Sequence, residues 1–147
     1  MLVDTNLLLY AAFADAPEHD VTRTWLDDRL ADSDRGIALC WPAVYAFLRL
    51  ATSARALGAR AVGLSEAWFA VEALVLHPHV RVVVAGPLHL SIAAELAKTP
   101  GLRSDDVPDI ELATLAIEHG LVLATRDSGF RRFSALRTID PVELDAG

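Results

Sequence analysis

The chain opens with MLVDTNLLLY (residues 1–10), an apolar run that contains a single carboxylate, Asp4. Leu2 and Val3 predict a buried strand, and the Asp, Thr and Asn that follow are residue types that cap helix starts. The pattern therefore places Asp4 where a strand ends and a helix begins, at the edge of the core. An ionised carboxylate there is costly unless it is hydrogen-bonded, paired or bound to a cation. Taken alone, an ordinary helix cap is the simpler explanation of this residue.

Strands and helices alternate along the rest of the sequence. Apolar runs predict further strands at 37–40, 81–84, 121–124 and 136–139. Capping residues and apolar spacing predict helices that start within 15–20 and end near 30, and that cover 42–58, 65–78, 87–98 and 107–119. Strands that are apolar throughout indicate a parallel sheet with helices on both faces. We therefore expect one α/β domain over residues 1–147, with a mostly parallel central sheet flanked by helices.

The helix predicted at 65–78 has the clearest local signals. Ser65 is expected to cap its start, and Leu64 is placed to pack against Phe69 as a hydrophobic staple. The stripe predicted to face the core comprises Trp68, Val71 and Val75.

Composition narrows the class of protein. The chain is 53% hydrophobic and has a mean hydropathy of +0.34, above the roughly 45–50% apolar content of ordinary soluble chains. This surplus predicts an exposed apolar face, and hence a homodimer or a bound partner. The net charge of -7 disfavours broad, charge-driven adhesion to nucleic acid. It leaves open a nucleic-acid enzyme whose acids gather at a metal site, because bound cations invert the local field.

Location and redox chemistry follow from what the sequence lacks. No apolar run approaches the roughly 18 residues of a membrane span, and the opening lacks the flanks of a signal peptide. We therefore expect a cytoplasmic protein without membrane association. Cys40 is the only cysteine, which excludes an internal disulfide and a cysteine-based zinc site and predicts a buried structural thiol. The five histidines show no metal-ligand spacing.

Two further acids are expected at the sheet edge where Asp4 lies. Asp109 falls in the first turn of the helix before strand 121–124, and Asp127 follows that strand. Each also has a structural explanation, since Asp109 suits the helix dipole and Asp127 can cap the next turn. In open parallel sheets, however, sites form beyond the carboxyl ends of the strands. Clustered carboxylates repel each other unless a cation neutralises them, and such hard oxygen ligands favour Mg²⁺ or Mn²⁺ over zinc.

Four stretches in order carry a family resemblance. They are Asp4–Asn6, Phe47–Thr52 after a Trp-Pro opening, Asp109 with the following Leu112–Gly120, and Thr125–Phe130. Together they resemble the PIN domain over essentially the whole chain, and most closely the VapC toxins of bacterial toxin–antitoxin pairs. The resemblance implies a Rossmann-like three-layer fold and a metal-dependent endoribonuclease. It also implies a homodimer, held inactive by a small VapB-like antitoxin.

The resemblance further implies which residues form the site. Asp4, Asp109 and Asp127 match the metal-site acids, and Asn6 and Thr125 match polar residues that support them. The reaction implied is hydrolysis of an RNA phosphodiester with Mg²⁺ or Mn²⁺ bound, leaving a 3'-hydroxyl and a 5'-phosphate.

The sequence departs from the family pattern at two positions. Ala46 stands where a Glu is common, and Gly129 stands where a second Asp often precedes the Phe of the last motif. We therefore expect one firmly bound ion, with a second bound weakly or only with substrate. Asp106 lies three residues before Asp109 and could assist it from the same helix face, although a helix cap is the alternative. Glu111 lies roughly 200° around the helix from Asp109 and should point elsewhere.

RNA would also need basic and aromatic contacts around these acids. Arginine binds phosphate with two parallel hydrogen bonds, and four arginines follow strand 121–124. They are Arg126, Arg131, Arg132 and Arg137. Arg49, one turn beyond Ala46, could bind an acid or the RNA backbone, and Tyr45 lies off the core stripe where it could stack on a base. A solvated surface is the alternative explanation for the arginines.

Two other classes of protein compete with the nuclease. One is a catalytically weakened PIN-like module that binds RNA or a protein partner. The other is a receiver-type phosphotransfer domain, which needs a Lys on a late strand. The only lysine, Lys98, falls in a predicted helix, which argues against the receiver.

Overall fold

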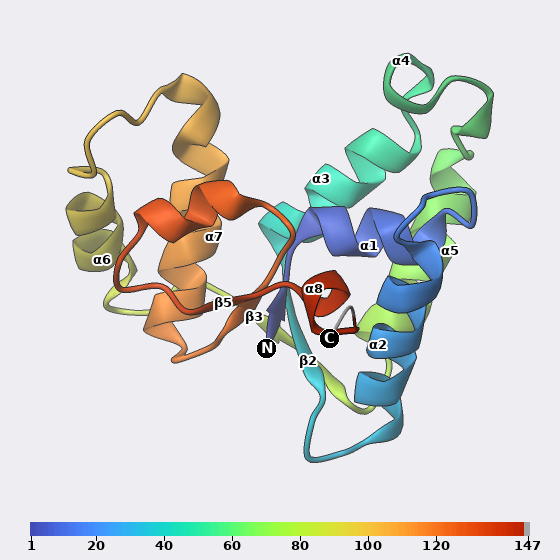
Figure 1. The fold of residues 1–147 in the computed structure, drawn as a ribbon, viewed down its shortest axis with the longest axis horizontal. Coiled ribbons are helices and arrows are strands. Elements are labelled where there is room, and N and C mark those ends of the chain that lie inside the picture. Colours follow the sequence, from blue (N-terminus) through green and yellow to red (C-terminus); the bar gives the residue numbers. More distant parts are fainter. Residues whose placement is uncertain (146–147) are drawn as a thin grey trace.

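The computed structural model describes residues 1–145 and has a sheet between two layers of helices (Figure 1). Within residues 1–145 the strands of the sheet lie in the order β3-β2-β1-β4-β5, and neighbouring strands are parallel. The strands are β1 (Leu2–Val3), β2 (Ile37–Cys40), β3 (Val80–Val83), β4 (Leu123–Ala124) and β5 (Thr138–Ile139). The expected α/β fold, with a mostly parallel sheet flanked by helices, is confirmed.

The helices follow the predicted order, with one predicted helix divided into two and one addition near the end of the described chain. They are α1 (Thr5–Ala12), α2 (His19–Ala31), α3 (Trp41–Ala51), α4 (Ala54–Leu57), α5 (Leu64–Val75), α6 (His89–Leu96), α7 (Val107–Glu118) and α8 (Pro141–Asp145). Short 3₁₀ turns cover Gly58–Arg60 (η1), Ser104–Asp106 (η2) and Ser128–Arg132 (η3). The sequence did not predict α8. Over residues 1–145, no helix is both long enough and apolar enough to cross a membrane.

The central strands are apolar throughout because each of their faces is covered. Val3 and alternate residues of β2 pack with α1, α2, α3 and α5 in one core. Leu2 and the remaining residues of β2 pack with α6, α7 and η3 in the other. Cys40 lies in this second core as a buried free thiol, as predicted, and burial raises its pKa to about 11. The thiol is therefore protonated at neutral pH.

The helix predicted over 42–58 is broken after Ala51. The Thr52 hydroxyl donates to the Leu48 carbonyl at 2.8 Å, and the Ser53 hydroxyl accepts from the Ala56 amide to cap α4. Side chains that bond to nearby backbone in this way compete with helix continuation. Gly58 then adopts a positive φ of 58° and turns the chain toward α5.

For α5 the predicted cap, staple and burial of Trp68 are wrong, whereas Val71 and Val75 of the predicted stripe do pack in the core. The helix starts at Leu64 with Gly63 as its cap, so Ser65 is not the cap. Leu64 and Phe69 are 63% and 73% exposed, so the staple does not bury them, and Trp68 is 42% exposed. The buried residues of α5 are Ala67 and Val71. Because apolar residues surround most of this helix, the pattern placed the edge of its buried face wrongly at Trp68.

The sheet order brings together two segments far apart in sequence. β1 lies in the centre, with β2 on one side and β4 on the other. The Asp4 amide donates to the Ala124 carbonyl at 3.0 Å, directly beyond the Val3–Ala124 pair of the parallel ladder. Asp4 and Thr125 therefore leave the sheet side by side, at the carboxyl edge where strand order reverses.

Candidate functional site

Asp4 is buried at the end of β1, and donors surround its carboxylate. Its Oδ1 accepts the Thr5 amide at 2.6 Å. Its Oδ2 accepts the Asn6 amide group at 2.7 Å and the Thr125 hydroxyl at 2.6 Å. The carboxylate is thus held in one orientation by its own helix start and by the neighbouring strand.

The Thr125 hydroxyl links this carboxylate to the segment that carries Asp127. It donates to Asp4 and accepts from the Asn6 amide group at 3.1 Å and from the Asp127 backbone amide at 2.9 Å. A hydroxyl offers one donor and two acceptor lone pairs, so this one is fully used. Asn6 and Thr125, the residues that the resemblance implied as supports, both contact Asp4 directly.

Asp127 also performs the structural role weighed from the sequence. Its Oδ1 accepts the Gly129 amide at 2.7 Å and so caps η3. The side chain is exposed, and no hydrogen bond to its Oδ2 occurs within residues 1–145. Capping thus occupies one oxygen and leaves the other available to a ligand.

Asp109 lies in the first turn of α7, where an arginine binds it. Arg132 Nη2 donates to Asp109 Oδ2 at 2.7 Å, and Nη1 pairs with Asp106 Oδ1 at 2.9 Å. Asp106 is buried, and its other oxygen accepts the Arg103 amide at 2.7 Å. The Asp106 side chain therefore caps η2 and holds Arg132 in place. It makes no capping hydrogen bond to the first turn of α7.

The charge of Asp127 acts on the other two predicted acids. Burial raises the pKa of Asp4 most, hydrogen bonds from Thr125 and Thr5 lower it, and the Asp127 charge raises it again. Burial likewise raises the pKa of Asp109, followed by repulsion from Asp127, while the Arg132 guanidinium lowers it and Asp4 raises it. The pKa of both carboxyls therefore lies above its usual range, as expected of acids that repel one another.

These shifts predict how stability depends on pH in the absence of divalent ions. In the folded chain the pKa of Asp4 lies above the ordinary 3.8. Between pH 3.8 and that raised pKa, the folded chain keeps a proton that the unfolded chain has released, so the stability contributed by Asp4 falls as pH rises. The variant Asp4→Asn has no carboxyl to titrate and does not lose this stability. Its melting temperature, measured against wild type from about pH 4 to 7, should improve relative to wild type as pH rises. A difference independent of pH would contradict the raised pKa.

The donor chemistry of the acids fits a hard divalent cation, since the groups are carboxylates whose mutual repulsion a cation would relieve. Their present spacing does not complete a site. No group of three Asp, Glu, His or Cys side chains within residues 1–145 lies close enough to hold an ion. Asp109 is instead paired with Arg132 through Oδ2, so a guanidinium already neutralises this carboxylate.

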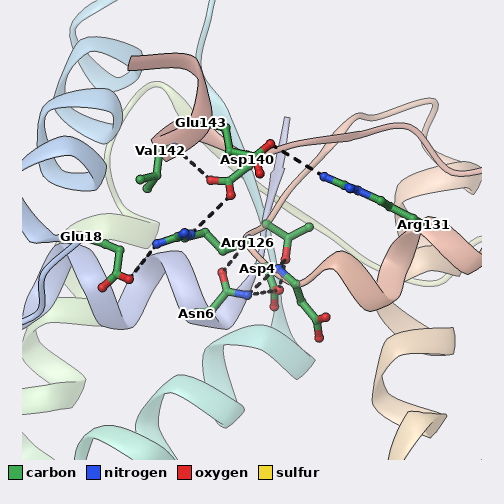
Figure 2. A network of polar contacts seen from close by, with 10 residues as sticks. Asp4, Asn6, Glu18, Arg126, Arg131, Asp140, Val142 and Glu143 are labelled. Atoms are coloured by element: carbon green, nitrogen blue, oxygen red, sulfur yellow. Dashed lines mark hydrogen bonds and ion pairs between the residues drawn. The ribbon is translucent and has the colours of Figure 1, made fainter. Parts of the chain in front are cut away.

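The arginines that follow β4 are largely compensated within the chain. Arg126 lies between Glu18 and Asp140 (Figure 2). Its Nη1 is 2.7 Å from Glu18 Oε1, and its Nε is 3.3 Å from Asp140 Oδ2. Arg131 lies within 3.7 Å of Glu143 at an exposed position. The positive patch expected beside Asp127 is therefore neutralised in part by Glu18, Asp140 and Glu143. Contact of these arginines with RNA stays a prediction.

Arg49 and Tyr45 lie elsewhere, in a cleft of about 670 Å³ between α3 and α5. Both are exposed, and Trp68 forms part of the opposite wall. No ion pair joins Arg49 to an acid in the described residues. Arg49 takes no part in the hydrogen bonds described above for Asp4, and its role toward an acid or RNA stays a prediction.

The two positions at which an acid is missing differ in their surroundings. Ala46 is a half-buried residue of α3. A Cβ at Gly129 would lie 2.9 Å from Asp127 Oδ1 and 3.2 Å from Arg132 Nη2. The absence of a side chain at position 129 therefore leaves room for the guanidinium beside the acids, a feature that only the tertiary structure reveals.

Comparison with known proteins agrees with this architecture. Residues 1–136 match the family described as PIN domain. The chain is 37% identical over 142 residues to Ribonuclease VapC33 of Mycobacterium tuberculosis, covering 97% of this chain and 98% of that protein. It is 35% identical to Ribonuclease VapC31 of the same organism, covering 95% and 97%.

Solved structures share the fold at lower sequence identity. VapBC2 from Rickettsia felis, bound to a DNA fragment from its promoter, has a TM-score of 0.68 at 15% identity and covers 94% of this chain and 96% of that chain. VapBC-1 from nontypeable Haemophilus influenzae also has a TM-score of 0.68, at 16% identity, with coverage of 95% and 96%. By the sequence match along nearly its full length, this chain belongs to the PIN domain family.

Proposed function

We propose that this chain is a metal-dependent endoribonuclease, the toxin of a VapBC-like toxin–antitoxin pair. The observation that carries the proposal is the buried Asp4 carboxylate at the strand-order reversal, joined through Thr125 to the Asp127 segment. Burying a carboxylate is costly, and a catalytic role accounts for that cost better than a helix cap. Relatives named as VapC ribonucleases at 35–37% identity support the same activity.

Asp4, Asp109 and Asp127 would hold Mg²⁺ or Mn²⁺. The bound ion would acidify a water molecule and neutralise charge on the attacked phosphate. Asn6 and Thr125 keep the Asp4 oxygens oriented through donated hydrogen bonds. Because these donors favour the ionised carboxylate, they oppose the effect of burial and keep Asp4 available as an anionic ligand.

We assign a VapB-like antitoxin as partner and a homodimer as the assembly. Two solved proteins of this fold are VapBC proteins by name. This chain also exposes several large apolar side chains, which a partner or second copy would cover. The most exposed among them are Leu90, Leu76, Phe69, Leu64 and Tyr45.

The proposal predicts RNA cleavage that depends on a divalent ion. Purified chain incubated with total RNA and Mn²⁺ or Mg²⁺ should produce discrete fragments with 5'-phosphate and 3'-hydroxyl ends, and excess EDTA should abolish them. Gel analysis, followed by ligation that requires a 5'-phosphate, provides the readout. RNA retention without cleavage under either metal would instead support the alternative of a catalytically weakened PIN-like binding module.

A further inference from the structure

Arg132 occupies an unusual place among the acids. It is the last residue of η3, and its guanidinium bridges two carboxylates at the start of α7. The distances are 2.9 Å to Asp106 Oδ1 and 2.7 Å to Asp109 Oδ2, with the three side chains 13–29% exposed. Charged pairs this close and half-buried are screened less than surface pairs. Arg132 therefore neutralises charge at the position where the proposed function requires a metal ligand.

The two carboxylates hold Arg132 unequally. Asp106 is fixed, because one of its oxygens accepts the Arg103 amide while the other binds Arg132, and these contacts hold its pKa below the usual range. Asp109 is less well compensated, because Asp127 and Asp4 both repel it. The Arg132–Asp106 contact is thus the anchor, and the Arg132–Asp109 contact is the one that a competing cation could replace.

The surroundings of the guanidinium fit such an exchange. Its Cζ lies 5.5 Å from the centre of the Phe133 ring, which supports the plane by a cation–π contact. Its buried Nε has no hydrogen-bond partner within residues 1–145. A Cβ at position 129 would lie 3.2 Å from Nη2, so Gly129 leaves that end of the guanidinium uncrowded. One end of Arg132 is therefore anchored while the other has space beside it.

We propose that Arg132 is a built-in counter-ion that competes with the divalent cation for Asp109. The inference rests on the proposed metal site and adds a control of its affinity. In the metal-free chain, Arg132 relieves the repulsion at Asp109. When the cation binds, Asp109 exchanges Arg132 for the ion, and Asp106 keeps the guanidinium at the rim. Arg132 therefore stabilises the empty site and weakens its affinity for metal.

Titration calorimetry of Mn²⁺ into the metal-free full chain tests this inference. Removing the competitor in Arg132→Gln should tighten the Mn²⁺ dissociation constant by roughly tenfold, equivalent to about 1.4 kcal/mol. The matched control is Arg131→Gln, one residue away at an exposed position beside Glu143, and it should leave the constant within about twofold. An unchanged or weaker affinity in Arg132→Gln would overturn the inference, because a residue that merely positions Asp109 for the ion predicts weakening.

A double-mutant cycle separates competition at Asp109 from a general effect of charge. In the Asp109→Asn background, Arg132→Gln should no longer tighten Mn²⁺ binding. Tightening that persists there would overturn the inference in favour of long-range electrostatics. If Arg132→Gln does not fold, Arg132→Lys replaces it, since a single ammonium cannot reproduce the two-sided bridge. Tighter binding by Arg132→Lys supports competition, and unchanged or weaker binding contradicts it.

Failure of the nuclease proposal is distinguishable from failure of this inference. Suppose that Arg132→Gln binds Mn²⁺ more tightly than wild type but neither protein cleaves RNA. The counter-ion inference would then stand, and the nuclease proposal would be rejected. If the wild-type chain cleaves RNA and Arg132→Gln leaves its Mn²⁺ affinity unchanged, the nuclease proposal would stand and the counter-ion inference would be rejected. Absence of Mn²⁺ binding in both wild type and variants would overturn the inference directly.

Discussion

Replacing Asp4 by Asn should reduce metal-dependent RNA cleavage by about 100-fold or more, because several kcal/mol of charge stabilisation depend on the bound ion. The amide removes the charge of a buried ligand while nearly preserving its shape. Its oxygen can still accept one of the donors that now hold the carboxylate. Initial rates on a defined RNA at saturating Mn²⁺, with circular dichroism to check folding, measure the effect.

The matched control for Asp4→Asn is Asp105→Asn. Asp105 is an exposed acid of η2 that neighbours the site in sequence, and its side chain makes no hydrogen bond or ion pair in the described residues. Its rate should stay within about twofold of wild type, as for other surface substitutions. Cleavage by Asp4→Asn at the wild-type rate would reject the assignment of Asp4 as a metal ligand.

Replacing Phe133 by Ala should lower the free energy of unfolding by about 3–5 kcal/mol, the usual cost of removing a buried aromatic ring. Phe133 is 1% exposed, and its ring lies 6.3 Å from that of Phe130. The two rings attach η3 to the core shared with α6 and α7. The loss is a large fraction of the roughly 5–15 kcal/mol that stabilises a domain. Urea denaturation followed by fluorescence measures it.

Two further substitutions serve as controls for Phe133→Ala. Phe133→Leu keeps most of the apolar volume and should cost less than about 1.5 kcal/mol. Phe69→Ala removes a ring that is 73% exposed on α5, and it should change stability by no more than about 0.5 kcal/mol. Equal losses for Phe133→Ala and Phe69→Ala would contradict the assignment of Phe133 to the core.

The predictable part of the fold is the part in which local pattern and tertiary environment agree. Residues 37–40 are apolar throughout because both faces of β2 are covered, so the sequence identified the strand and its burial. The parallel arrangement then followed from alternation with helices. In α5 the pattern was right for Val71 and Val75, which pack in the core, and wrong for Trp68, which lines a surface cleft together with Leu64.

The candidate site divides in the same way. Asp4, Asn6 and Thr125 were named from the sequence, and the structure joins their side chains by hydrogen bonds. The bridge from Arg132 to Asp109 was missed, since it connects residues 23 positions apart through tertiary packing. From sequence, Arg132 was one arginine in a basic segment, and spacing alone carried no signal that distinguished it.

The central position of β1 also orders events during protein synthesis. The first strand pairs with Leu123–Ala124 in the middle of the sheet, so the site depends on contacts between segments that are synthesised far apart in time. A nascent chain that has not reached Thr125 carries Asp4 but lacks the hydroxyl that holds it and the acid that follows. Such non-local closure is also slow to form. An incomplete translation product therefore cannot assemble this acid edge.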